Sequence, residues 1–472
     1  MATTSGDHPL LIGGERVETG DWTEVRSPYS GDVVGRIAKG GAAETRRALD
    51  AAAAALASPL PAHERARILD ATAHLLAERQ EEAAQLISAE AGKPLKAARV
   101  EAQRAVSTYT FAAVEARKLT GETVPMDASP AGEGKLAFTI RLPIGVIGAI
   151  SPFNFPLNLV AHKIAPALAA GCPVVLKPAS ATPFSALFLA KLEEEAGLPP
   201  GWLNVVSGSS SEIGDELVGD DRVKLITFTG SGDVGWGIAA RAPRKRVKLE
   251  LGNATPAIVC ADAPEGTASK LAANAFSFAG QSCISVQRIF VLADAWDAFV
   301  AEFVPKVEAL KVGDPGDPDT DVGPVISEGD RERILEWIRD SKGEVLTGGE
   351  TNEDGLIRPT VIANPAPDDK VQCEEVFGPV VTVTRVASLD DAIEQANATR
   401  YGLQAAIFSG DLPTCLAAAQ RLEFGGVIVN EAPTFRADQM PYGGVKASGN
   451  TKEGPAWAVR ELTEERLVVL SL

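Results

Sequence analysis

The chain has 472 residues, of which 45% are hydrophobic and 23% are charged, and its formal net charge at pH 7 is −18. This composition is typical of a soluble globular protein, and the length predicts two or three domains. The strongly acidic balance argues against nucleic acid or an anionic membrane as a partner.

Cysteine usage and hydropathy bear on metal binding, disulfides and the cellular compartment. The five cysteines and four histidines lack the short spacings of a structural metal site, so we predict no metal. An odd number of cysteines favours a reducing compartment over a disulfide framework. The N-terminus lacks a basic segment followed by an apolar core, and no apolar run approaches the ~18 residues of a membrane span. We therefore expect a cytoplasmic protein with no membrane partner.

The first part of the chain is expected to begin with strands and continue as helices. Residues 9–40 combine strand formers with turn residues. From 41 to about 118 the pattern is helical, interrupted by Gly-Lys-Pro at 92–94. Two further strands are predicted over 136–141 and 466–472. An unpaired apolar strand promotes aggregation, so the last one pairs either within the chain or with another subunit.

From residue 144 short apolar runs alternate with helical segments. Helices are predicted near 158–170, 183–196 and 211–219, and a second series of strands and helices runs from about 256 to 430. Such alternation is typical of parallel sheets covered on both faces by helices. We therefore predict two α/β domains in succession, with ligands bound beyond the carboxyl ends of the strands.

The sequence FAGQSCISVQR, at 278–288, contains the candidate nucleophile Cys283. Gly280 and Ser282 are small, so a ligand can approach the sulfur closely. A thiolate attacks carbonyl carbons well, and the ordinary thiol pKa of ~8.5 requires only modest activation. The alternative is a buried cysteine that only fills space, so the assignment depends on neighbouring motifs.

Three polar residues at predicted strand ends are candidate partners. Glu250, in LELGN, fits a ribose ligand, a general base or a surface acid. Lys177, after PVVL, fits a cofactor ligand or a solvated strand end, and Asn154, in SPFNFPLN, fits an oxyanion donor or a turn residue. The sequence GSGDVG at 230–235 fits the dinucleotide fingerprint G-x-G-x-x-G, which is weak alone, although a helix N-terminus there would favour phosphate.

Six motifs resemble, in their order and spacing, those of the aldehyde dehydrogenase superfamily, and together they cover nearly the whole chain. They are SPFNFPLNLVAHKIAPALAAGCPVVLKPAS, FTGSGDVG, LELGN, GQSC, EEVFGPV and PYGGVKASG. The resemblance implies an α/β fold with two Rossmann-type domains and a small β oligomerisation element. The dinucleotide-binding domain would span 1–118 and 142–251, the catalytic domain 252–454, and the oligomerisation element 119–141 and 455–472. It also implies a homodimer or homotetramer.

The resemblance implies how the reaction is catalysed. Cys283 would be the nucleophile, Asn154 and the Cys283 N–H the oxyanion donors, and Glu250 the general base rather than a ribose ligand. These residue types agree with the chemistry. Thiolate attack creates an oxyanion that needs donors, collapse expels hydride to a nicotinamide, and the remaining thioester needs an activated water. The expected activity is NAD- or NADP-dependent oxidation of a small aldehyde to the free acid.

Two alternatives to this activity are open. In the CoA-acylating branch of the resembled superfamily, CoA replaces water in releasing the thioester, but its members typically lack the glutamate of LELGN, so Glu250 favours hydrolysis. A non-catalytic binding member of the fold is the second alternative, and the presence of Cys283, Glu250 and Asn154 disfavours it.

The cofactor residues are implied by the same resemblance. Lys177 would bind the adenosine ribose, Gly230 and Ser231 would face the pyrophosphate, and Glu375 and Phe377 would hold the nicotinamide ribose and ring. Further cofactor contacts are expected at Ile150, Ser151, Pro152, Phe153, Leu251 and Gly252.

Cofactor choice is expected to depend on Ser180, in KPAS. NAD-preferring relatives in the resembled family often carry glutamate there, and its carboxylate would repel a 2′-phosphate. Serine removes that repulsion, so we expect NADP to be tolerated. Some NAD-using relatives also have serine at this position, which leaves the preference open.

The loop NEAPTFRADQMPYGGVK, at 430–446, forms one wall of the aldehyde tunnel in the resembled family. An apolar aromatic often stands near the place of Arg436, whose planar fork suits a carboxylate or phosphonate. Arg104 is a second candidate, and Phe155 is expected to contact the same substrate. The alternatives for Arg436 are a solvated loop residue and a structural ion pair. Within the resembled family the chain looks most similar to the lactaldehyde, succinate-semialdehyde and phosphonoacetaldehyde types. If Arg436 binds substrate, we expect small aldehydes with an anionic tail to be preferred over neutral ones.

Overall fold

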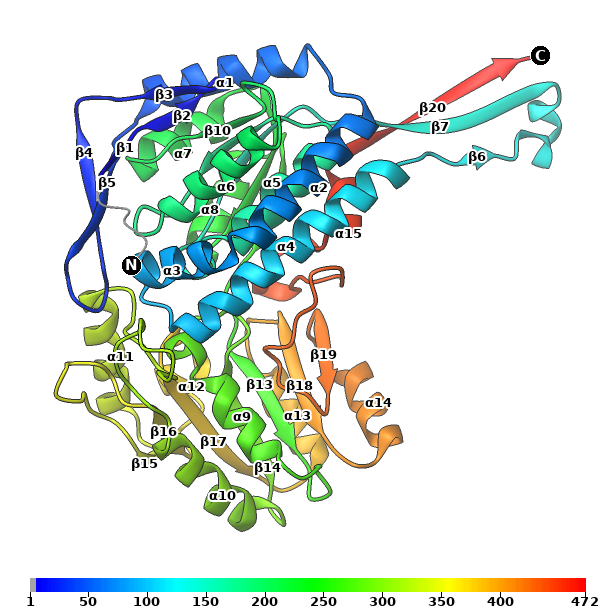
Figure 1. Cartoon of the computed structure of the whole chain (residues 1–472). Helices are drawn as coiled ribbons and strands as arrows, with labels where there is room; N and C mark the ends of the chain where they lie inside the picture. The colour runs from blue at the N-terminus through cyan, green and yellow to red at the C-terminus, as the bar shows by residue number, and fades with distance from the viewer. Residues whose placement is uncertain (1–5) are drawn as a thin grey trace.

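The first lobe is built on a seven-stranded sheet with the order β12-β11-β8-β9-β10-β2-β3 (Figure 1). We describe residues 6–472 of a computed structural model. The five strands from β12 to β10 run parallel, as the alternating pattern predicts. The β2–β3 hairpin adds to this sheet antiparallel, which the local pattern does not reveal because its partner, β10, lies far away in sequence. The strands are Leu10–Ile12 (β2), Glu15–Val17 (β3), Val146–Ile150 (β8), Val174–Lys177 (β9), Leu203–Val205 (β10), Val223–Thr229 (β11) and Arg246–Glu250 (β12).

Within residues 6–472, helices α1 and α5–α8 pack on this first sheet, and α2–α4 pack on other helices of the same lobe. The helices predicted near 158–170, 183–196 and 211–219 are confirmed. The helical region that begins at 41 consists of four helices, and the predicted break at 92–94 separates two of them. Gly92 adopts a left-handed φ of 66° at the end of α3, and Pro94 caps the start of α4. The helices are Ala42–Leu56 (α1), Ala62–Glu78 (α2), Gln80–Ala91 (α3), Leu95–Lys118 (α4), Asn158–Ala170 (α5), Phe184–Glu195 (α6), Ser210–Gly219 (α7) and Gly232–Arg241 (α8).

The second lobe is built on another seven-stranded sheet, with the order β15-β16-β17-β14-β13-β18-β19. Its six strands from β16 to β19 run parallel, and β15 pairs antiparallel at one edge. The sequence pattern predicts five of these strands but not β15 or β16. The strands are Thr255–Val259 (β13), Val286–Leu292 (β14), Glu344–Thr347 (β15), Thr360–Ala363 (β16), Val380–Val386 (β17), Gln404–Phe408 (β18) and Gly426–Val429 (β19).

Helices cover the second sheet as well, and each lobe buries its own apolar core. None of the helices within residues 6–472 is long and apolar enough to cross a membrane. The helices of this lobe are Thr267–Ala275 (α9), Trp296–Glu308 (α10), Glu328–Asp340 (α11), Lys370–Cys373 (α12), Leu389–Asn397 (α13) and Leu412–Arg421 (α14), and Pro455–Glu461 (α15) follows them in the chain.

A long β ribbon projects from the body of the molecule (Figure 1). Its strands are Thr463–Ser471 (β20), Lys135–Pro143 (β7) and Thr123–Val124 (β6), in that order across the sheet. The C-terminal strand therefore pairs within the chain, antiparallel to β7. Its other edge is open, and Leu467 on it is 55% exposed. The expected role of this ribbon in oligomerisation stays a prediction, as do the domain boundaries.

A small sheet near the N-terminus completes the fold. It consists of Asp7–His8 (β1), Val33–Ala38 (β5) and Trp22–Arg26 (β4), so the strands and turns predicted over 9–40 are confirmed.

Candidate active site

The candidate site lies where the first lobe meets the second. In the first lobe Asn154, Lys177 and Glu250 lie at or beyond the carboxyl ends of β8, β9 and β12, as expected. In the second lobe the expectation is wrong, because Cys283 precedes β14 and Glu375 precedes β17. The chain passes from β12 almost directly into β13, so the carboxyl edge of one sheet faces the amino edge of the other.

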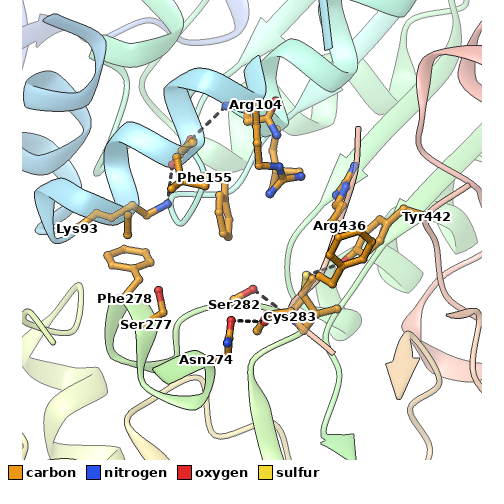
Figure 2. A pocket seen from close by; sticks show the side chains of 18 of the residues that line it. Lys93, Arg104, Phe155, Asn274, Ser277, Phe278, Ser282, Cys283, Arg436 and Tyr442 are labelled. Atoms are coloured by element: carbon orange, nitrogen blue, oxygen red, sulfur yellow. Dashed lines mark hydrogen bonds and ion pairs between the residues drawn. The ribbon is translucent and has the colours of Figure 1, made fainter. Parts of the chain in front are cut away.

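A strained loop after α9 positions Cys283. Phe278 and Ala279 have φ values of 51° and 52°, and Gly280 has a φ of 70°. A Cβ on Gly280 would lie 2.1 Å from the carbonyl oxygen of Gly378, so only glycine fits there. Two consecutive non-glycine residues in the left-handed region are costly, and such strain is concentrated at functional sites. The loop places Cys283 on the wall of a cavity of about 350 Å³ (Figure 2).

The surroundings of the Cys283 thiol disfavour its ionisation in the free chain. Its Sγ lies 2.9 Å from the hydroxyl oxygen of Tyr442. The pKa of Cys283 is raised to about 12, mainly by burial and also by the carboxylates of Glu375 and Glu250, while Tyr442 and Arg436 oppose the shift. A thiolate at this position therefore requires additional positive charge or hydrogen bonding.

Asn154 lies beside the segment that leads to Cys283. Its Nδ2 donates to the carbonyl oxygen of Gln281 at 3.0 Å, which leaves the second N–H of this amide for another acceptor. The backbone oxygen of Asn154 accepts a hydrogen bond of 2.6 Å from Lys93 Nζ. Lys93 forms a fully buried ion pair with Glu101, whose other carboxylate oxygen accepts from the N–H of Leu157. Asn154 is thus held in place both at its side-chain amide and at its backbone carbonyl.

Glu250 is a buried carboxyl group without a hydrogen bond. It is 4% exposed, and both of its side-chain oxygens lack a partner among the described residues. Burial raises the pKa of Glu250 well above its usual range, and the negative charge of Glu453 raises it further, against the opposing charges of Arg436 and Lys163. A Cβ on Gly443 would lie 2.6 Å from Glu250 Oε1, so a glycine there leaves room for this side chain.

Arg436 lies in a buried ion pair beside the cavity rather than in solvent. Its side chain is 5% exposed, and its Nη2 donates to Glu453 at 2.8 Å and lies 3.1 Å from His162 Nε2. Its guanidinium lies over the ring of Tyr442 at 3.8 Å. The Nε atom of Arg436 is buried and has no acceptor among the described residues. The ion-pair alternative is therefore correct in part, and one donor is still available for a ligand.

Arg104 reaches the same cavity from α4 and is 20% exposed. Its Nη2 donates to Asp438 at 2.8 Å, and Asp438 also lies 3.0 Å from His162 Nε2. Figure 2 shows Arg104 and Phe155 extending into the pocket above Cys283. The three residues predicted to contact substrate therefore line one cavity with Cys283.

The residues predicted to hold the cofactor lie on the first lobe and on the loop before β17. Lys177 is buried, and among residues 6–472 its Nζ has only the neighbouring carbonyl of Pro178, at 3.3 Å. Ser151 has a buried hydroxyl without a partner in the same part of the chain. Burial raises the pKa of Glu375 to about 7, and a Cβ on Gly252 would lie 2.2 Å from its Oε2. These unsatisfied groups and the close approach at Gly252 fit a polar ligand such as a dinucleotide.

The remaining predicted cofactor residues differ in exposure. The rings of Phe153 and Phe377 meet edge to face, with their centroids 5.8 Å apart. Ser180 and Ser231 are exposed, and Ser231 precedes the first turn of α8, where free N–H groups favour an anion. Half-buried positions are Ile150, Pro152 and Gly230, whereas Leu251 is buried.

Several residues of the site were missed by sequence reasoning. Tyr442, His162 and Lys163 lie within the quoted motifs, so a signal was available, but no chemistry had been assigned to them. Glu453 lies outside the quoted segments, and Asp438 lies in the loop 430–446 without an assigned role. His162 and Asp438 are 276 positions apart in the sequence, so no local pattern connects them. Within residues 6–472 no group of three or more His, Cys, Asp or Glu side chains could hold a metal ion.

Comparisons with known proteins show the family of this chain. Residues 16–468 match the model of the aldehyde dehydrogenase family. The 3-sulfolactaldehyde dehydrogenase of Priestia aryabhattai is 44% identical over 466 residues, which are 98% of each protein. The lactaldehyde dehydrogenase of Methanocaldococcus jannaschii is 39% identical, over 98% of this chain and 100% of that protein. The crystal structure of glyceraldehyde-3-phosphate dehydrogenase from Methanocaldococcus jannaschii, complexed with NADP, has a TM-score of 0.91 at 38% identity, over 95% of this chain and 99% of that one. The chain belongs to the aldehyde dehydrogenase family.

Proposed function

We propose that this protein oxidises a small aldehyde with an anionic tail to the free carboxylic acid, with NAD or NADP as the oxidant. The observation that carries the proposal is one cavity that is lined by both Cys283 and two arginines, Arg104 and Arg436, and that lies beside Asn154. A nucleophile, an oxyanion donor and cationic groups are the parts that this reaction requires.

In the proposed reaction Cys283 attacks the aldehyde carbon through its Sγ. The carbonyl oxygen becomes an oxyanion, and the free N–H of the Asn154 amide donates to it. The buried pair of Lys93 and Glu101 keeps this donor in place. A nicotinamide cofactor, when bound, supplies the positive charge that favours the thiolate and accepts the hydride. Lys177, Ser151 and Glu375 are the groups with free hydrogen-bonding capacity to hold it.

Glu250 would act after the oxidation step, when the acyl group is a thioester on Cys283. Its carboxylate accepts a proton from a water molecule, and the resulting hydroxide attacks the thioester. A base without hydrogen-bond partners has both oxygens free for this water. The same feature supports hydrolysis over transfer to CoA, because a base for water is present at this site.

The anionic tail is supported by the two arginines. Arg436 has a buried Nε without an acceptor, and Arg104 is partly exposed to the cavity. Two of the reported relatives have names that include a sulfonate or a phosphate, whereas lactaldehyde is neutral. A neutral hydroxyaldehyde is therefore the second candidate substrate, and a neutral substrate would leave the Arg436 Nε unused.

The proposal is tested by following the absorbance of reduced cofactor. The assay compares two pairs of aldehydes that differ in a terminal anion. The first pair is propanal and succinate semialdehyde, and the second is lactaldehyde and 3-sulfolactaldehyde. Each aldehyde is assayed once with NAD and once with NADP. We expect higher kcat/KM for the anionic member of each pair and no requirement for CoA. Equal efficiency within both pairs would contradict the anionic tail, and strict dependence on CoA would contradict hydrolysis.

We further propose a cytoplasmic location and assembly into a homo-oligomer. Five free cysteines fit a reducing cytoplasm. The exposed apolar edge of β20 fits assembly into a homodimer or homotetramer, because an open strand edge is otherwise prone to aggregate. Light scattering of the purified protein measures the assembly directly, and a monomer would contradict it.

A further inference from the structure

The phenol of Tyr442 is in direct contact with the reacting sulfur. The hydroxyl oxygen lies 2.9 Å from Cys283 Sγ, and this is the one side-chain hydrogen bond of the thiol within the described residues (Figure 2). Tyr442 is 3% exposed and lines the same cavity as Cys283. Such a contact is possible only because tyrosine, rather than phenylalanine, occupies this position.

We propose that Tyr442 is a catalytic residue that stabilises the Cys283 thiolate by donating its O–H to Sγ. The phenol does not act as the base. It keeps its proton throughout, while the thiol proton is released to the solvent through the cavity that Cys283 lines, so the negative charge of the ionised pair stays on sulfur. The proposal rests on Cys283 being the nucleophile and adds a residue to that site.

The donor direction follows from the environment of the pair. Burial raises the pKa of Tyr442 well above its usual range, so the phenol stays protonated when Cys283 ionises. The only proton between the two atoms then belongs to oxygen, and the hydrogen bond runs from Oη to Sγ. A hydrogen bond to an ionised acceptor is about twice as strong as a neutral one.

Three contacts hold the phenol in this orientation. The backbone of Tyr442 pairs with that of Glu453, its ring packs against Ile284 and Leu403, and the guanidinium of Arg436 covers the ring at 3.8 Å. A cation over an aromatic face withdraws electron density electrostatically from the ring, which makes the O–H a better donor. Arg436 thereby supports Tyr442 in addition to any contact with substrate.

The test is alkylation of the free protein by iodoacetamide, comparing wild type with Tyr442→Phe, without cofactor or aldehyde. Loss of a hydrogen bond to a charged group should raise the thiol pKa by about one to two units. A more basic thiolate is also more nucleophilic, with a Brønsted slope of ~0.4–0.5, so the net rate at fixed pH should fall roughly three- to fifteen-fold. The alkylated residue is identified by peptide mass spectrometry, and Cys283→Ser gives the background.

Tyr109→Phe is the matched control. Tyr109, on α4, is also fully buried, and its O–H donates to Glu193 at 2.8 Å. This substitution should lower the melting temperature without changing alkylation of Cys283. Tyr442→Phe keeps the ring and its volume, and its circular dichroism spectrum checks that it is folded. Wild-type alkylation rates in folded Tyr442→Phe, or faster ones, would overturn the proposal. A Cys283 that is unreactive in both proteins at every pH would instead contradict its role as nucleophile.

Discussion

Because Lys93 and Glu101 form a buried ion pair, we expect Lys93→Met to lower both the stability and the catalytic rate of the protein. The pair is 1% and 0% exposed, and Lys93 Nζ also lies 3.6 Å from the ring centroid of Phe155. Replacing Lys93 by methionine leaves a buried carboxylate whose remaining partners are the N–H groups of Leu157 and Asn158. Breaking such a pair from one side costs about 3–5 kcal/mol.

This cost converts into a measurable change in the melting temperature. If all 472 residues unfold together, the unfolding entropy is about 1 kcal/mol per K, so we expect Lys93→Met to melt roughly 3–5 °C below wild type. Adding Glu101→Gln should recover part of this loss, because it removes the unpaired charge. The Asn154 carbonyl also loses its donor, so the pre-steady-state burst of reduced cofactor should slow.

Lys96→Met is the matched control for this prediction. Lys96 lies on α4, as Glu101 does, is 44% exposed and pairs with Asp321 at the surface, so its loss should cost ~0–1 kcal/mol. Circular dichroism melts of five proteins make the comparison: wild type, Lys93→Met, Glu101→Gln, the double variant and Lys96→Met. Equal melting temperatures for Lys93→Met and Lys96→Met, or additive effects of Lys93→Met and Glu101→Gln, would refute the reasoning.

Four further outcomes are expected. Cys283→Ser should lower steady-state oxidation by roughly four orders of magnitude or more while cofactor binding, followed by fluorescence, is retained. Glu250→Gln should show a burst of reduced cofactor followed by a stalled steady state, and loss of the burst itself would place Glu250 earlier in the reaction. Arg436→Lys keeps a positive charge opposite the buried carboxylate of Glu453 but loses the planar guanidinium, so KM should rise for anionic aldehydes more than for neutral ones. Ser180→Glu should raise KM for NADP much more than for NAD, and equal changes would contradict the assigned position of the 2′-phosphate.

The parts of the site that were predictable are those encoded in contiguous sequence. Cys283, Asn154 and Glu250 all lie in short motifs. For Asn154 and Glu250 the motif lies at the carboxyl end of a strand, where alternation of strands and helices places ligand-binding residues. Most of the parallel strands were predictable as well, because buried strands are continuous apolar runs. The antiparallel edge strand β15 and its parallel neighbour β16 were not, since such short strands carry little periodicity.

The electrostatics of the site were not predictable from local sequence. Arg436 was expected to be either free for substrate or paired, and only the fold shows that Glu453 and His162 meet it. Asp438, two residues further along the same loop, pairs with Arg104 from another lobe. The packing of α4 and α5 against the loop brings such partners together, so these pairs cannot be predicted from residue spacing in the sequence.

Burial disfavours the ionised forms of the Cys283 thiol and the Glu250 carboxyl group, so both depend on other groups of the site for ionisation. Desolvation raises the pKa values of both Cys283 and Glu250, so the free chain holds a neutral thiol and a carboxyl group without hydrogen bonds. A carboxyl group whose pKa is raised on folding binds a proton in the folded state that the unfolded state has lost. Its stabilising contribution is therefore complete below pH ~4.5 and is lost as pH rises toward the folded pKa. Glu250→Gln should for this reason melt higher than wild type at alkaline pH, with a difference that shrinks as the pH is lowered. A difference that did not depend on pH would mean that Glu250 is already ionised in the folded protein, and the argument from its desolvation would fail.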